Sequence, residues 1–166
     1  MSERKPPHPG DIYARERANV AALKAAYPHQ FPEPYWAYGW PDGWHRLVVE
    51  ACAGLARHSP QGHWLQIKEK FGGLRLYYDG GPLRLDLQAA DGVHCIAFSP
   101  GGGLVEPTDL NALISGLEKA SRETCCLCGG VQGTGRAVCF SGWWLTACET
   151  CEPLIRAHRA LPPGER

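Results

Sequence analysis

Long apolar runs are missing from this chain. No stretch approaches the roughly 18 consecutive apolar residues that mark a candidate membrane-spanning helix. The first ten residues, MSERKPPHPG, contain no apolar core of the kind that secretory signal peptides carry. We therefore expect a protein that has no membrane partner and that is not exported through a Sec-type route.

A net charge is missing as well. Seventeen Lys and Arg side chains balance seventeen Asp and Glu side chains, so the formal net charge is zero. A neutral chain has no overall positive field that would attract nucleic acid or an anionic membrane. Apolar residues make up 44% of the 166 residues and charged residues 20%, which predicts a packed core in one domain, or in one domain with a small addition.

Cysteine, in contrast, is abundant and unevenly distributed. The chain has eight cysteines, and six of them fall within residues 125–151. A small secreted domain usually spreads its cysteines along the chain as a disulfide framework. A cluster of cysteines in a chain without an export signal instead favours metal binding.

Two Cys-x2-Cys pairs form the most specific pattern in the sequence. Cys125 and Cys128 make the first pair, and Cys148 and Cys151 make the second, with nineteen residues between the pairs. Each two-residue gap lets two thiolates approach one ion from a tight turn, and two such turns complete the tetrahedron that zinc prefers. Because four thiolates leave no open coordination position, we expect a structural Zn²⁺ ion and not a catalytic one.

Alternatives to this ligand set remain at the level of sequence. Cys126 lies inside the first pair, and His158 follows Cys151 by seven residues, so either side chain is an alternative ligand. Two disulfides or a redox-active Cys-x2-Cys motif are the alternatives to a metal site. Gly129, directly after the first pair, disfavours the following helix that a thioredoxin-like redox motif requires.

The segment around the second cysteine pair predicts a hairpin followed by a helix. Residues 136–140 and 143–146 have the composition of two strands, and the Ser-Gly pair between them suits a turn. A Glu-Pro pair opens a helix directly after the last cysteine. This order predicts a treble-clef-like module, with a zinc-ribbon-like module as the alternative.

The remainder of the chain predicts an α+β fold in which a small antiparallel sheet packs with helices. Apolar periodicity places helices at 11–27, 43–58 and 108–122, and strands within 63–79, 83–87 and 93–99. We expect a loose tail over residues 1–10, an α+β domain over 11–122, and a zinc-binding module over 123–160 that packs on this domain.

Residues 31–44 are rich in aromatic side chains. The stretch holds three prolines and six aromatics, which suits no regular element. We favour a loop that lies over the core; the alternative is an exposed recognition surface that includes Trp36 and Trp40. Asp42 is expected to cap the helix that follows.

The segment 63–79 predicts a β-hairpin that turns at Gly72-Gly73. The two-residue period of a strand assigns Leu65, Ile67, Glu69 and Phe71 to one face. Glu69 is a charge at a position where this pattern asks for an apolar side chain. We expect either an exposed strand end or a fixed partner for Glu69, such as Arg75.

The segment Lys-Glu-Lys-Phe-Gly-Gly-Leu-Arg at residues 68–75, followed by the two cysteine pairs, resembles a set of small zinc-binding proteins found in phages and prophages. The resemblance covers roughly residues 40–155, and the KEKFGGLR segment is its most specific part. It implies an accessory protein that acts in the cytoplasm of a host bacterial cell, and it carries over no catalytic residue.

These observations favour a non-catalytic, zinc-stabilised protein that binds a host or phage protein and that inhibits, for example, a host defence protein. The candidate binding surface consists of Trp36, Trp40, Lys68, Glu69, Lys70 and Arg75. One alternative is nucleic-acid binding through a basic strip that consists of Lys68, Lys70, Arg75 and Arg84. In this alternative, Trp143 and Trp144 stack on bases. Another is a nuclease built on a treble-clef-like frame, although the module from 125 to 158 offers only His158 as a general base.

Overall fold

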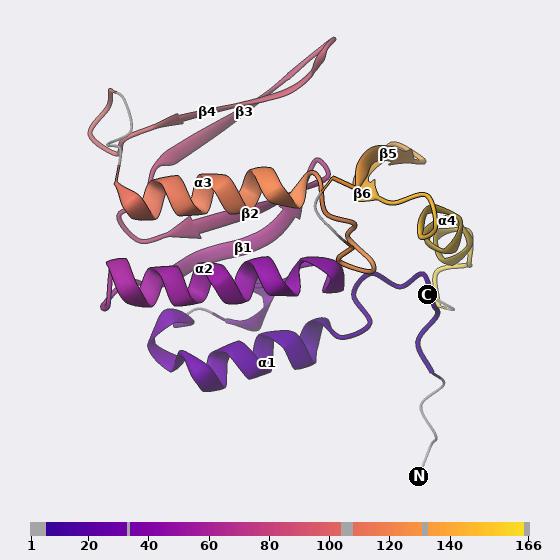
Figure 1. Cartoon of the computed structure of the whole chain (residues 1–166), viewed down its shortest axis with the longest axis horizontal. Helices are drawn as coiled ribbons and strands as arrows, with labels where there is room; N and C mark the ends of the chain where they lie inside the picture. The colour runs from indigo at the N-terminus through magenta and orange to yellow at the C-terminus, as the bar shows by residue number, and fades with distance from the viewer. Residues whose placement is uncertain (1–5, 33, 104–107, 131–132, 165–166) are drawn as a thin grey trace.

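The computed structural model describes residues 6–32, 34–103, 108–130 and 133–164, and it has an α+β architecture (Figure 1). The helices are α1 (Glu16–Ala26), α2 (His45–His58), α3 (Asp109–Ser121) and α4 (Glu152–Arg159), with short 3₁₀ helices at Pro28–Gln30, Tyr35–Ala37 and Asp42–Trp44. The strands are β1 (Trp64–Lys70), β2 (Gly73–Tyr78), β3 (Leu83–Ala89), β4 (Gly92–Phe98), β5 (Arg136–Phe140) and β6 (Trp143–Ala147). The expected α+β class, with a small cysteine-bearing module at the C-terminal end, is confirmed.

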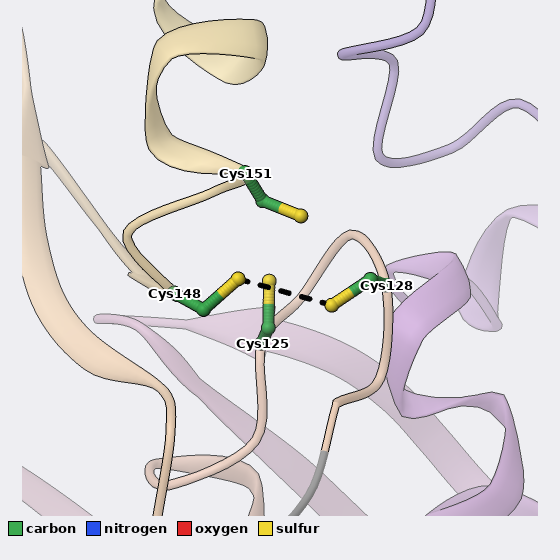
Figure 2. Close-up of side chains that lie close together, drawn as sticks. All are labelled: Cys125, Cys128, Cys148 and Cys151. Carbon is green, nitrogen blue, oxygen red and sulfur yellow. Dashed lines mark hydrogen bonds between the residues drawn. The ribbon is translucent and has the colours of Figure 1, made fainter.

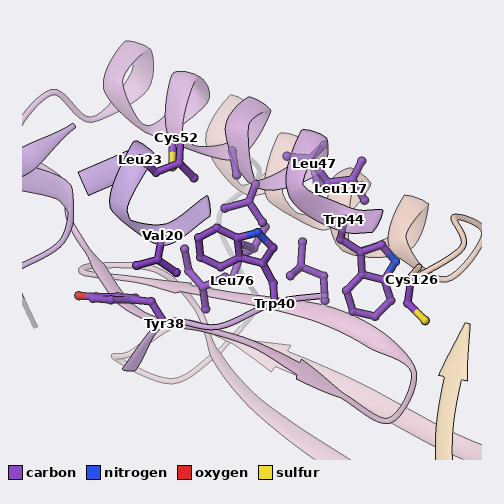
Figure 3. Packing of buried hydrophobic residues seen from close by; sticks show 14 of the residues in the cluster. Val20, Leu23, Tyr38, Trp40, Trp44, Leu47, Cys52, Leu76, Leu117 and Cys126 are labelled. Carbon is purple, nitrogen blue, oxygen red and sulfur yellow. The ribbon is translucent and has the colours of Figure 1, made fainter. Parts of the chain in front are cut away.

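Helix α2 lies between α1 and α3, and the β1–β2 hairpin packs against α3 (Figure 1). The apolar stripe expected from the sequence of α2 faces the core, and the buried members of this stripe are Trp44, Leu47, Val48, Ala51, Cys52 and Leu55. Figure 3 shows several of these side chains interleaved with those of α1, α3 and β2. The 3.6-residue period was therefore sufficient to identify which face of this helix is buried.

The aromatic-rich stretch 31–44 contributes to the core. Tyr38 and Trp40 are almost completely buried, and the Tyr38 hydroxyl donates a 3.0 Å hydrogen bond to the Trp64 carbonyl. Gln30, also fully buried, donates from Nε2 to the Cys52 carbonyl and accepts a hydrogen bond from the Trp64 indole N–H. These bonds satisfy polar atoms of Gln30, Tyr38 and Trp64 that burial removes from water, whereas the buried Trp40 indole N–H has no hydrogen-bond partner among the described residues.

Asp42 performs a different role from the one expected. It lies in a 3₁₀ turn before α2 and makes no capping bond to that helix. Its carboxylate instead accepts hydrogen bonds from the Arg15 backbone N–H (2.9 Å) and the Asn19 side chain (3.2 Å). Asp42 therefore binds the N-terminal end of α1, where unpaired N–H groups and the helix dipole favour an anion.

The β1–β2 hairpin differs from expectation in two details. The turn residues are Phe71 and Gly72, both with positive φ, and Gly73 already belongs to β2. Two consecutive positive φ values give the twist that suits a two-residue hairpin turn. A bulge between Trp64 and Gln66 also shifts the alternation, so that Trp64 is buried. The assignment of Leu65 to the buried face was wrong, because a bulge adds one residue to the strand and reverses the side-chain alternation beyond it.

The strands do not combine into one larger sheet among the described residues. Antiparallel pairing joins β1 to β2, β3 to β4 and β5 to β6, which gives separate two-stranded sheets. Figure 1 shows the β3–β4 hairpin extending away from the helices, with its tip well beyond the body of the molecule. This hairpin therefore has two strand edges without a further strand.

The cysteine-bearing segment packs directly on the rest of the chain. The Trp44 indole N–H donates a 2.9 Å hydrogen bond to the Thr124 carbonyl, and the Thr146 hydroxyl donates a 2.7 Å bond to the Gly72 carbonyl. Buried apolar side chains of β5, β6 and α4 belong to the same hydrophobic cluster as those of α1–α3. One continuous core therefore supports both parts.

Two further expectations concern the chain's N-terminal part and membranes. Within the described part of the expected tail, His8 stacks on His158, and Gly10 packs closely against the backbone of α4. Residues 1–5 lie outside the described residues.

Among the helices that the structure describes, none has both the length and the apolarity to cross a membrane.

Candidate metal centre

The four cysteines of the two Cys-x2-Cys pairs converge on one point. Their sulfur atoms all lie within 4.8 Å of one another, and Figure 2 shows Cys125, Cys128, Cys148 and Cys151 directed toward a common centre. The Cys128 and Cys148 sulfurs are 3.9 Å apart. A disulfide requires about 2.05 Å, so these cysteines are free thiols, as are the other cysteines of the chain.

The geometry of the cluster fits zinc. A Zn–S bond of about 2.3 Å in a regular tetrahedron places neighbouring sulfurs about 3.8 Å apart. The Cys128–Cys148 separation of 3.9 Å is close to this value, and all separations in the cluster stay within 4.8 Å. The residues present therefore suit a tetrahedral Zn²⁺ ion, which would connect the knuckle at 125–128 to the start of α4 and hold the module's shape.

Backbone hydrogen bonds form the first knuckle. The Gly129 N–H bonds to the Cys125 carbonyl, and the Gly130 N–H donates to the Cys128 sulfur at 3.3 Å. Gly129 has a φ of +65°, and a Cβ there would lie 2.6 Å from the Gly43 carbonyl oxygen. Glycine is required because this residue combines a left-handed backbone with a close approach to the N-terminal end of α2.

The second pair lies where β6 ends and α4 begins. Cys151 is the N-cap residue of α4, and its backbone N–H bonds to the Cys148 carbonyl at 3.1 Å. The N-terminal end of a helix carries a partial positive charge, which favours thiolates. The observed order of knuckle, hairpin and helix agrees with the treble-clef-like or zinc-ribbon-like module expected from the sequence.

Ionisation of the four thiols is mutually unfavourable without a cation. Burial raises the pKa of Cys151, and so do a hydrogen bond from Cys148 and the charge of Cys125. The pKa of Cys128 is also raised, chiefly by burial. Burial opposes ionisation of Cys148 as well, but hydrogen bonds led by the Cys151 backbone N–H outweigh it and lower that pKa. A divalent cation would remove the mutual repulsion and favour thiolates at all four positions.

The two alternative ligands are not part of the cluster that the structure describes. Cys126 is completely buried, and Figure 3 shows its side chain beside Trp44 in the core. Burial strongly raises the pKa of this thiol. His158 stacks on His8 with ring centroids 5.2 Å apart, and it does not belong to the four-ligand group.

The predicted binding surface around the aromatic stretch is only partly present. Trp36 is 79% exposed, whereas Trp40 is completely buried, so the prediction of Trp40 as a surface residue was wrong. Both residues come from the same Pro-rich stretch, and composition alone does not distinguish a ring that covers the core from one that faces solvent. Trp36 therefore remains an exposed aromatic of this stretch.

The predicted basic strip is largely neutralised. Lys70 and Arg75 both contact Asp86, with N–O distances of 2.7 and 3.3 Å, and Arg84 pairs with Glu118. Arg75 is 2% exposed, so its assignment to the binding surface was also wrong. The neutralising carboxylates come from other elements, since Asp86 lies on β3 and Glu118 on α3. The local sequence does not show that these elements pack next to the basic residues.

Glu69 and Lys68 have partners other than those expected. Glu69 accepts hydrogen bonds from the Gly72 backbone N–H (2.8 Å) and the Trp143 indole N–H (2.9 Å). Burial raises the pKa of Glu69, although these two bonds partly offset the increase. Lys68 lies over the Tyr77 ring. Of the two alternatives for Glu69, an exposed strand end or a fixed partner, the structure shows a fixed partner, and that partner is Trp143 and not Arg75.

The structure also reveals a surface that sequence reasoning missed. The β3–β4 hairpin exposes Leu83, Leu85, Leu87 and Ile96, each with 43–50% of its surface accessible. The alternation of residues 83–87 was visible in the sequence, but the usual rule assigns the apolar face to the core. Here the apolar face points outward.

Comparison of the chain with protein-family models, with curated proteins and with solved structures yields no match.

Proposed function

We propose that this chain is a zinc-stabilised accessory protein of phages or prophages that acts in the cytoplasm of the host bacterium by binding another protein. A host defence protein that it inhibits is the target we favour. The phage setting is supported by the KEKFGGLR resemblance. The protein-binding role is supported by one observation above the others, the inverted orientation of the β3–β4 hairpin.

The hairpin is inverted because its polar face contacts the body of the protein. Arg84 and Asp86 make ion pairs with α3 and with the β1–β2 hairpin, respectively. The opposite face, which we call the leucine face, consists of Leu83, Leu85, Leu87, Ile96 and Phe98. An outward apolar face of this kind is typical of a protein-binding site, because the exposure of a contiguous apolar surface to water is unfavourable.

The hairpin is also structurally incomplete by itself. A two-stranded sheet is marginally stable in water unless a third strand or another apolar surface packs on it. The residues of the leucine face include no Asp, Glu, Lys or Arg, and His94 lies opposite Leu87 on it. We therefore assign to this face a partner protein that presents an uncharged apolar surface, and not a polyanion.

Nucleic-acid binding is not supported by the arrangement of the basic side chains. Lys70, Arg75 and Arg84, three of the four members of the predicted strip, are engaged with carboxylates. The phosphates of a nucleic acid would have to displace these carboxylates before they could bind the same cationic side chains. The exposed Trp143 is also occupied, since the Arg159 guanidinium lies 4.2 Å from its ring centroid.

Site-specific photo-crosslinking tests the proposal. A photoreactive residue is introduced at position 85 of the zinc-loaded full chain, or at position 49 as a control, since Val49 is exposed on α2. In host cells we expect position 85 to crosslink one protein that is identified by mass spectrometry, and position 49 to give no such product. The purified partner should then bind the unmodified chain with one defined stoichiometry.

The affinity of that complex decides the role of the leucine face. Leu85→Asp should weaken binding at least about thirtyfold, as expected for a residue at the centre of an interface, and Val49→Asp should change it less than about twofold. Equal binding by Leu85→Asp would contradict the proposal. So would crosslinking of position 85 to a second copy of this chain or to nucleic acid.

A further inference from the structure

A cavity of about 370 Å³ lies between α3 and the inner, polar face of the β3–β4 hairpin. Its volume falls in the range of small-molecule pockets, roughly 300–1,000 Å³. The charged side chains that line it are Arg75, Arg84, Lys119, Arg122 and Glu118. Four cations and one carboxylate in a chain with zero net charge indicate a local concentration of positive charge.

Arg75 is the most informative of these residues. Its guanidinium is buried, with one terminal nitrogen donating to the Leu74 carbonyl at 3.2 Å and the other contacting Asp86 at 3.3 Å. Its Nε–H has no hydrogen-bond partner in the described part of the chain. A buried N–H donor without an acceptor is costly, so an acceptor supplied by a ligand would be favourable at this position.

Two further cations at the cavity are not neutralised. In the ranges that the structure covers, neither Lys119 nor Arg122 has a carboxylate within ion-pair distance. Glu118, the carboxylate of the lining, is already engaged by Arg84 and by a backbone N–H. The unpaired charges therefore line the same cavity as the unpaired Nε–H of Arg75.

The electrostatic environment of Arg122 agrees with an anion site. Burial lowers the pKa of Arg122, and the charge of nearby Arg75 lowers it further. The charge of Arg75 thus disfavours the charged form of Arg122, while the more weakly acting carboxylates of Asp86 and Glu118 favour it. An anion between Arg75 and Arg122 would replace repulsion with attraction on both sides.

We propose that this cavity binds the phosphate group of a small phosphorylated ligand. The residues that line it include Arg75, whose Nε–H lacks a partner among the described residues, and the cationic Arg122 and Lys119. A phosphate monoester offers three acceptor oxygens and a charge of about −1.5 to −2, which matches these donors better than the single charge of a carboxylate does. Pro82 and Ala97 supply apolar lining for the organic part of the ligand.

A titration of the zinc-loaded full chain with inorganic phosphate, followed by ¹H–¹⁵N NMR, tests this assignment. Arginine Nε–H groups give their own signals, and the signal of Arg75 is identified by its absence in Arg75→Lys. We expect phosphate to shift this signal in a saturable manner. Acetate at matched ionic strength should leave it nearly unchanged.

Matched variants locate the site. Arg122→Gln and Lys119→Gln should each weaken phosphate binding about tenfold, because each loses one charge-assisted hydrogen bond. Arg17→Gln on α1 removes the same charge far from the cavity and should change the affinity less than about twofold. The proposal is overturned if phosphate produces no saturable shift, if acetate binds as well as phosphate does, or if both cavity variants bind like the parent chain. These outcomes are independent of whether a protein partner binds the leucine face.

Discussion

The Trp143 indole N–H donates a 2.9 Å hydrogen bond to Glu69 Oε2. This bond joins the β1–β2 hairpin to β6, 74 residues further along the chain. It lies close to the bond between the Thr146 hydroxyl and the Gly72 carbonyl, so two polar contacts hold the cysteine module against the same hairpin turn. An acidic side chain inside the KEKFGGLR segment is therefore an element of tertiary structure.

The ionisation of Glu69 provides a test of this contact. Because burial raises its pKa above the ordinary 4.5, the folded state takes up a proton at higher pH than the unfolded chain does. The contribution of Glu69 to stability therefore increases as pH falls from its folded pKa toward 4.5. Trp143→Phe removes a bond that lowers this pKa, so we expect the ¹³C NMR titration midpoint of the Glu69 carboxyl to rise. Trp144→Phe, at the adjacent exposed position, should leave the midpoint in place.

Metal content tests the assignment of the four ligands. Elemental analysis should find one zinc per chain, and Cys128→Ser and Cys148→Ser should lose it. Since binding of structural zinc contributes roughly 10 kcal/mol or more in comparable peptides, both variants should also lose the folded C-terminal module. Cys52→Ser, Cys95→Ser and Cys126→Ser should retain zinc. Equal zinc in the ligand and non-ligand variants would refute the assignment, and loss of zinc in Cys126→Ser alone would assign Cys126 as a ligand.

A pair of glycine substitutions tests the packing of the zinc knuckle on α2. A Cβ at Gly43 would lie 2.2 Å from the Cys125 carbonyl oxygen, whereas a Cβ at Gly116 in α3 would meet open space. We expect Gly43→Ala to lower the free energy of unfolding by about 1–3 kcal/mol and to weaken zinc retention. Gly116→Ala should raise it by about 0.5–1 kcal/mol through helix propensity. Urea denaturation measures both, and an equal response of the two variants would show that the knuckle does not contact Gly43 in solution.

The ion pair between Arg84 and Glu118 is predicted to anchor the β3–β4 hairpin. Their side chains are only 6% and 11% exposed, so removing one partner leaves a buried charge unpaired. Glu118→Gln should cost about 3–5 kcal/mol, and the double variant with Arg84→Gln should cost less than the sum of the single changes. Arg136→Gln breaks an ion pair with Glu152 in which the arginine is largely exposed and should cost less than about 1 kcal/mol. Additive effects of Arg84→Gln and Glu118→Gln would contradict a coupled pair.

Local patterns were sufficient to locate the helices and the metal ligands, although the helix predicted over 11–27 begins only at Glu16. The apolar stripe of α2 has the helical period, and all of its members are buried. The spacing of Cys125 from Cys128, and of Cys148 from Cys151, is short enough that a tight turn alone brings each pair together, and the tetrahedral preference of zinc then relates one pair to the other. These features depend on neighbours within a few residues, which a single sequence displays directly.

The surfaces depended on contacts between distant segments. Strand alternation divides residues 83–87 into an apolar and a polar face, but it does not determine which face packs on the rest of the protein. The ion pairs of Arg84 with Glu118 and of Asp86 with Arg75 turn the polar face inward. The same long-range contacts bury Trp40 and Arg75 and leave Trp36 exposed. Which side chains face solvent follows from the packing of whole elements, whereas the metal ligands and the helical core stripe follow from spacing along the chain.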